Sequence, residues 1–94
     1  MLIVNLTYKK SFEEVGKYLE EHMEFVKNEF SKGSFIASGK KVPRDGGIIL
    51  SKIKDIKKLE KILNEDPFII NDVAKYEITE FTLSTTGEGF ENLK

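Results

Sequence analysis

Apolar and polar residues alternate with a two-residue period at the start of the chain. Residues 2–9 place Leu2, Val4 and Leu6 on one face of an extended segment and more polar positions on the other. Alternation of this kind is typical of a strand with one buried face. A similar alternation returns at residues 74–83, so we expect strands at both ends of the folded region.

Two segments between these strands have the hydrophobic spacing of α-helices. Residues 12–32 follow Ser11, which offers a helix N-cap, and Gly33 marks the end of this helix. Residues 56–64 follow Asp55, a second N-cap candidate, and carry apolar residues three or four positions apart. The sequence therefore predicts one long helix and one short helix.

Two short apolar segments lie between the predicted helices. Residues 34–40 and 46–53 flank a loop that contains Pro43, Arg44, Asp45 and two glycines, which is typical of an antiparallel hairpin. The resulting order is βαββαβ. With right-handed crossovers, this order gives an α+β, ferredoxin-like sandwich of four antiparallel strands with both helices on one face.

The end of the chain has a different composition. Asp66 and Pro67 have the pattern of an N-cap followed by the first residue of a short helical turn. After the last strand, residues 84–94 are small, polar and glycine-bearing, and we expect a mobile tail. We therefore expect one domain over residues 1–83 and a polar tail over 84–94.

The sheet face that the helices leave open is expected to be partly apolar, and two copies of the chain are expected to pack these faces together as a homodimer. The residues assigned to this face are Ile3, Ile36 or Phe35, Ile49 and Phe81, mixed with Asn5, Thr7, Ser38, Ser51 and Thr79.

Composition removes several classes of function. The 94 residues carry 15 basic and 16 acidic side chains, for a net charge of −1, so we expect no nucleic-acid partner. The absence of cysteine excludes disulfides and thiolate metal sites. Neither a signal peptide nor a stretch of roughly 20 apolar residues is present, so we expect a cytoplasmic protein without a membrane partner.

His22, the only histidine, lies inside the apolar arc of the long helix, and a carboxylate partner would orient its ring for proton transfer. Asp66 is the candidate partner, because the short helix should pack beside the long one. Both residues also have a structural interpretation. A lone histidine on an apolar face is more often structural, and an aspartate before proline is a common helix cap.

The hairpin loop offers an anion site. Arg44 presents a planar fork that suits a carboxylate or phosphate, and Ser38 offers a hydroxyl. Lys41 adds a second positive charge, and Tyr8, at the end of the first strand, completes the candidate substrate-binding residues. The glycines of the loop lack the spacing of a nucleotide-binding motif and are equally suited to a simple turn.

The segments "EEHMEFVKNEFSKGSFIASG" and "NEDPFIINDVAKYEITEF" together resemble the YciI-like (YCII-related) family of small bacterial proteins. The resemblance covers residues 1 to about 82 and rests on His22, the "SG" at 38–39 and the "DPF" at 66–68 taken as a set. It implies a dimeric α+β barrel of ferredoxin-like subunits. One departure stands out: many members have a proline where this chain has Lys40.

The resemblance implies a His22–Asp66 dyad at the active site, with no cofactor and no metal. One histidine without cysteine would in any case leave a metal site dependent on carboxylates. Related dimeric α+β barrels include cofactor-free enzymes that act on small ring compounds.

Two functions stay open. The first is a cofactor-independent lyase, isomerase or hydrolase that acts on a small anionic or cyclic metabolite. The second is a non-catalytic module that binds or senses such a molecule in the same cleft.

Overall fold

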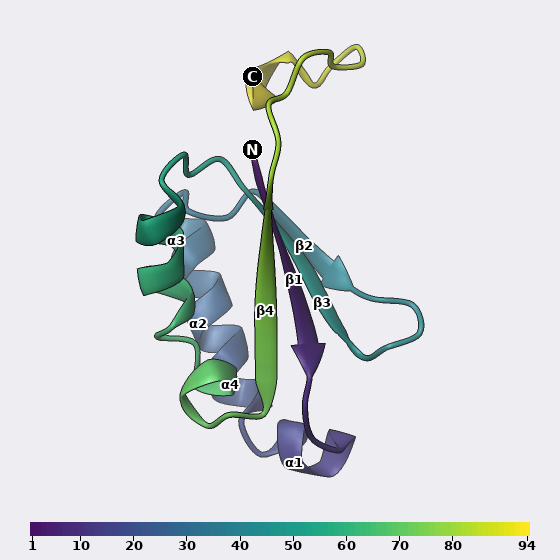
Figure 1. Cartoon of the computed structure of the whole chain (residues 1–94), viewed down its shortest axis with the longest axis vertical. Helices are drawn as coiled ribbons and strands as arrows, with labels where there is room; N and C mark the ends of the chain where they lie inside the picture. Colours follow the sequence, from purple (N-terminus) through teal and green to yellow (C-terminus); the bar gives the residue numbers. More distant parts are fainter.

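The computed structural model describes residues 1–94, and its four strands form one antiparallel sheet in the order β2-β3-β1-β4. Figure 1 shows helices α2 and α3 on one face of this sheet, whereas no helix covers the other face. The α+β, ferredoxin-like fold class predicted from the sequence is confirmed. The elements are β1 (Leu2–Tyr8), α1 (Phe12–Gly16), α2 (Leu19–Ser31), β2 (Ala37–Lys40), β3 (Gly46–Ser51), α3 (Ile56–Leu63), α4 (Pro67–Ile70), β4 (Ala74–Glu80) and the 3₁₀ helix η1 (Glu91–Leu93).

The long helix predicted over 12–32 is divided into α1 and α2. Ser11 caps α1 as expected, because its hydroxyl accepts from the backbone N–H of Glu14. The chain then leaves helical geometry at Tyr18, whose φ and ψ are −113° and 5°. Gly16 has a low helix propensity and ends α1 just before this break. The break allows α2 to begin at Leu19 on a new axis, with His22 in its first turn.

Helices and sheet enclose a core that divides into two clusters. Leu2 and Val4 of β1 pack with residues of α2 and α3 in the first cluster. Leu6, near the other end of β1, packs with Val15 and Phe68 in the second. The three β1 residues are at most 4% exposed, as the alternation in the sequence predicts. The second cluster joins α1 and α4 to β1, and it supports the candidate site.

The strand register corrects several assignments to the open face. Ile49 lies opposite Val4 and Ser51 lies opposite Leu2, so both side chains point toward the helices, where they are buried. Ser38 pairs with Ile49 and lies on the helix face too. Because side chains alternate along a strand, a shift of one position reverses the face of every residue.

Irregular backbone before β2 explains the difficulty of assigning this strand. The predicted strand 34–40 is shorter in the structure and begins only at Ala37. Phe35 turns into the core, where it is 2% exposed, and therefore does not belong to the open face. The strands predicted over 46–53 and 74–83 are also shorter, ending at Ser51 and Glu80.

The turn between α4 and β4 is fastened to the end of β1. The backbone N–H of Lys9 donates to the carbonyl of Val73 at 2.8 Å, and its ammonium forms an ion pair with Asp72. This ammonium holds the pKa of the Asp72 carboxyl below its usual range. Asp72 has a φ of 56°, a left-handed conformation that aspartate tolerates better than most residues. These contacts hold the C-terminal end of α4 close to the end of β1.

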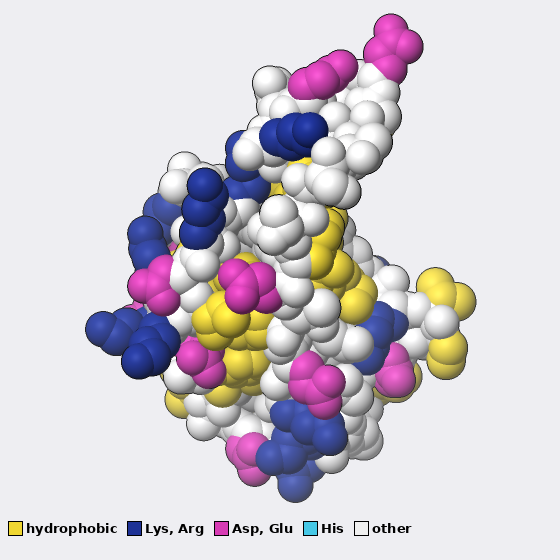
Figure 2. Space-filling view, turned by 45° about the horizontal axis from the view of Figure 1, so that its top comes forward, with side chains coloured by type: hydrophobic (Ala, Val, Ile, Leu, Met, Phe, Trp, Pro, Cys, Tyr) yellow, Lys and Arg dark blue, Asp and Glu magenta, His cyan; other side chains and the backbone are white.

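The C-terminal segment 84–94 contains η1, and Lys52 donates to the carbonyl of Asn92 at 2.6 Å. Its predicted mobility stays a prediction. Figure 2 shows acidic and basic side chains interspersed over one face of the molecule, with hydrophobic side chains visible between them. None of the helices is long and apolar enough to cross a bilayer.

Candidate functional site

Asp66 caps helix α4, as its position before Pro67 predicts. Its Oδ1 accepts from the backbone N–H of Phe68 at 2.9 Å, and Pro67 occupies the first turn, where no N–H is needed. At the other end of this helix, the side-chain amide of Asn71 donates to the carbonyl of Pro67 at 2.8 Å. Asp66 is nevertheless fully buried, which a helix cap does not require.

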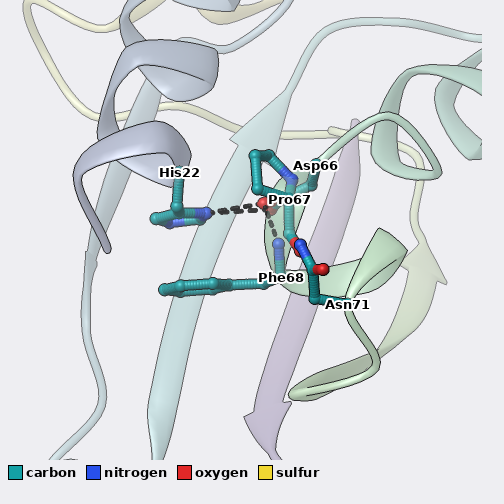
Figure 3. Close-up of polar contacts among 5 residues, drawn as sticks. All are labelled: His22, Asp66, Pro67, Phe68 and Asn71. Atoms are coloured by element: carbon teal, nitrogen blue, oxygen red, sulfur yellow. Dashed lines mark hydrogen bonds and ion pairs between the residues drawn. The ribbon is translucent and has the colours of Figure 1, made fainter. Parts of the chain in front are cut away.

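His22 is the second hydrogen-bond partner of the buried Asp66 carboxylate. The Nδ1–H of His22 donates to the Asp66 carboxylate, with distances of 2.8 Å to Oδ1 and 3.0 Å to Oδ2 (Figure 3). The side chains are 13% and 1% exposed, respectively. A carboxylate that accepts from Nδ1 fixes the tautomer with its proton on that nitrogen. One carboxylate therefore caps α4 and orients an imidazole on α2.

Phe68 fixes the plane of the same imidazole. The rings of His22 and Phe68 are stacked, with centroids 3.9 Å apart and an interplanar angle of 5°. Phe68 is itself 1% exposed and meets Tyr8 edge to face at 6.0 Å. The hydrogen bond sets the rotation of the imidazole and the stacking sets its tilt, so His22 is held in a single orientation.

Beyond the imidazole lies a cavity of about 270 Å³. A cavity of ~150 Å³ already holds benzene, so this one has room for a single substituted ring. Nε2 of His22 makes no hydrogen bond within the protein, and no buried side-chain nitrogen or oxygen lacks a partner. Nε2 is therefore open to the cavity. The polar side chains of the lining are Tyr8, His22, Ser38, Lys40 and Arg44, and the rest of the lining is apolar or glycine.

Gly46 allows the hairpin loop to approach β1 closely beside this cavity. A Cβ at this position would overlap the carbonyl oxygen of Leu6, so only glycine permits the approach. This contact places Arg44, two residues earlier in the loop, at the rim of the cavity. The glycines of the loop thus position a side chain of the site.

The structure brings together five of the six predicted site residues. Tyr8, Ser38 and Arg44 line the cavity with His22, and Asp66 lies behind the imidazole. Lys41 is elsewhere: its ammonium donates to Asn5 at 2.9 Å and to Thr7 at 3.0 Å.

The alternation of β2 explains this separation, because neighbouring side chains point to opposite faces of the sheet. Lys40, rather than Lys41, shares the cavity face with Ser38. Lys40 was not predicted as a lining residue, although a strict two-residue alternation from Ser38 indicates it. Leu19 and Met23, which form apolar walls of the cavity, were not predicted either. No group of three or more His, Cys, Asp or Glu side chains is placed to hold a metal ion.

Comparison with solved structures identifies a neighbour of the same fold. It is the 5-chloro-2-hydroxyhydroquinone dehydrochlorinase of Burkholderia phenoliruptrix, in complex with 2,5-dihydroxybenzoquinone. The TM-score is 0.65 at 10% sequence identity, and the alignment covers 89% of this chain and 96% of that chain. Among curated proteins, no sequence matches this chain.

The family model of the YCII-related domain matches residues 1–82, which include every strand of the sheet and both members of the His22–Asp66 pair. The resemblance identified from the sequence is thereby confirmed. The protein belongs to the YCII-related family.

Proposed function

We propose that this protein is a cofactor-independent enzyme, a lyase, isomerase or hydrolase, that acts on a small anionic or cyclic metabolite. The observation that carries the proposal is the environment of His22. One nitrogen of its ring is bound to a buried carboxylate, and the other is open to a cavity large enough for one ring. This is the arrangement that general acid–base catalysis needs.

The proposed reaction begins with a proton transfer to His22. With Nδ1–H bonded to Asp66, the lone pair of Nε2 faces the cavity and accepts a proton from a bound substrate. The carboxylate and the face of the stacked Phe68 ring both stabilise the resulting imidazolium. The imidazolium then returns the proton to the leaving group or to another atom of the substrate, which restores the starting state.

The other polar residues of the cavity would bind the substrate. Arg44 offers charge and a planar fork for a carboxylate or an enolate oxygen. The hydroxyls of Ser38 and Tyr8 offer further hydrogen bonds to the substrate. The dehydrochlorinase of the same fold supports both the enzyme class and a ring-shaped substrate, as an analogy between folds.

A turnover screen tests the proposal. Protein dialysed against EDTA is incubated with planar cyclic acids and with 5-chloro-2-hydroxyhydroquinone, and chloride release and substrate consumption are followed by ion and liquid chromatography. We expect at least one compound to be consumed without an added cofactor. A ligand that binds tightly but is recovered unchanged, with no other compound consumed, would instead support the non-catalytic binding module.

We also propose that the protein acts as a homodimer through its open sheet face. Ile3 and Leu50 lie opposite each other on this face, and Phe81 beyond the end of β4 is 37% exposed. Covering these apolar side chains would stabilise a pair of sheets packed face to face. Sedimentation equilibrium should give twice the chain mass for the wild type and a smaller mass for Leu50→Lys. A wild-type monomer at all concentrations would contradict the proposal.

The cytoplasmic location also stays a prediction, which cell fractionation would test.

A further inference from the structure

Arg44 stands between two hollows of the surface. The first is the cavity that His22 lines, and the second is a more open hollow beside α1. Three residues line both of them: Tyr8, Leu19 and Arg44. These side chains therefore form the boundary between the two hollows, and Arg44 is the only charged group of this boundary.

No carboxylate neutralises Arg44. None of the ion pairs within the chain includes it, and the neighbouring Asp45 lies 3.4 Å from the ammonium of Lys41 instead. The cavity lining contains no acidic side chain, whereas Lys40 contributes a second positive charge. A cavity with two cations and no anion favours a negatively charged ligand.

The contact that holds Arg44 is aromatic. Its guanidinium carbon lies 5.8 Å from the centroid of the Phe12 ring, within the range of a cation–π interaction. Phe12 is 59% exposed, so the core does not account for a large apolar side chain at this position. Phe12 in turn meets Tyr8 edge to face, with centroids 5.9 Å apart.

A continuous series of ring contacts connects Arg44 to the imidazole. It runs from Arg44 over Phe12 to Tyr8, from Tyr8 to Phe68 at 6.0 Å, and from Phe68 to His22 at 3.9 Å. Phe68 is buried and Tyr8 packs against the same core cluster, so core packing fixes the end of the series next to His22. Phe12 and Arg44, which are exposed, extend the series from this fixed end to the surface.

We propose that Phe12 is a positioning residue that holds the Arg44 guanidinium at the boundary between the two hollows. There the guanidinium binds the charged group of a planar organic anion, and the ring of that anion lies in the cavity toward His22. The binding of the anion stands independently of catalysis. Only the direction of its ring, toward a proton-transferring His22, rests on the proposed function.

Benzoate and benzamide test this inference, because they have nearly the same shape and differ in charge. Each is titrated into isotopically labelled protein, and NMR shifts at Arg44 and His22 give the two affinities. We expect the wild type to bind benzoate at least about tenfold more tightly than benzamide, and Arg44→Gln to bring the two affinities within about twofold of each other.

Phe12 is tested by a pair of variants. In Phe12→Leu the affinity for benzoate should fall roughly two- to fivefold, the range expected for losing one exposed cation–π contact, while that for benzamide stays constant. Phe12→Tyr retains a ring face and should restore the preference for benzoate, whereas a merely structural role of Phe12 would change the affinities for benzoate and benzamide alike in Phe12→Leu. Val42→Ala is the control, because Val42 is 97% exposed and lies two residues from Arg44.

The outcomes separate this inference from the proposed function. Equal affinities for benzoate and benzamide in the wild type, or an unchanged preference in Phe12→Leu, would overturn the inference. Selective benzoate binding in a protein that consumes no substrate would overturn the proposed function and leave Phe12 and Arg44 in the roles assigned here.

Discussion

His22→Asn is expected to lower kcat by roughly 10²- to 10⁴-fold, the usual contribution of a positioned general acid or base. The side-chain amide nitrogen of asparagine falls close to the position of Nδ1, so it can still donate to Asp66. What the substitution removes is Nε2, the nitrogen that is open to the cavity. Steady-state kinetics on the substrate found by the turnover screen, with the melting temperature measured in parallel, would show turnover lost while the fold is retained.

Two further variants sharpen this test. Met23→Leu changes the wall of the same cavity without changing its charge or much of its volume, and kcat should stay within about twofold of the wild type. His22→Ala leaves a space in which added imidazole can replace the lost ring and restore part of the activity. Wild-type turnover in His22→Asn would show that another group transfers the proton.

The sequence was sufficient to name Asp66 as the candidate partner of His22. The helical spacing placed His22 on the apolar arc of the long helix, and the pattern at Asp66–Pro67 placed an acid at the start of a neighbouring helix. Because both placements depend on short-range rules, they hold despite the break at Tyr18. Whether the carboxylate that caps the short helix also reaches the imidazole stayed open in the sequence, and the structure shows both contacts.

The faces of the hairpin strands were harder to predict. The register between β3 and β1 decides whether Ile49 points to the core, and this register depends on pairing across the sheet rather than on the local sequence. The irregular backbone around Phe35 also interrupts the alternation, so the face of Ser38, and with it the face of Lys40, could not be counted from the start of the predicted strand.

The series of ring contacts between Arg44 and His22 could not be predicted either, because its rings are far apart in the sequence. Phe12, Tyr8 and Phe68 come from three separate segments, and only the packing of α1 and α4 against β1 brings them into contact. In the sequence each of them fits an ordinary core position. The orientations of these rings, and hence their contacts with His22 and Arg44, depend on tertiary packing.

Asp66→Ala is expected to reduce the free energy of unfolding by about 2–4 kcal/mol. Losing the cap of α4, which accepts from the N–H of Phe68, accounts for about 1 kcal/mol, and leaving the Nδ1–H of His22 without its acceptor adds about 1–3 kcal/mol. Urea unfolding followed by circular dichroism measures the change. Asp55→Ala is the matched control: Asp55 caps α3 through Lys57 at 3.0 Å but is exposed and bonds no histidine, so it should cost only about 0.5–1 kcal/mol.

Asp66→Asn separates the two roles of the carboxylate. The amide oxygen can still cap α4 through the N–H of Phe68, so most of the stability should remain. The same oxygen position also lies 2.8 Å from Nδ1 of His22 and can still accept from it, but the amide carries no negative charge to stabilise the imidazolium. Turnover should then fall, though less than in His22→Asn, while the protein stays folded. If Asp66→Asn kept full activity, or if Asp66→Ala cost no more than Asp55→Ala, the carboxylate would be a helix cap alone.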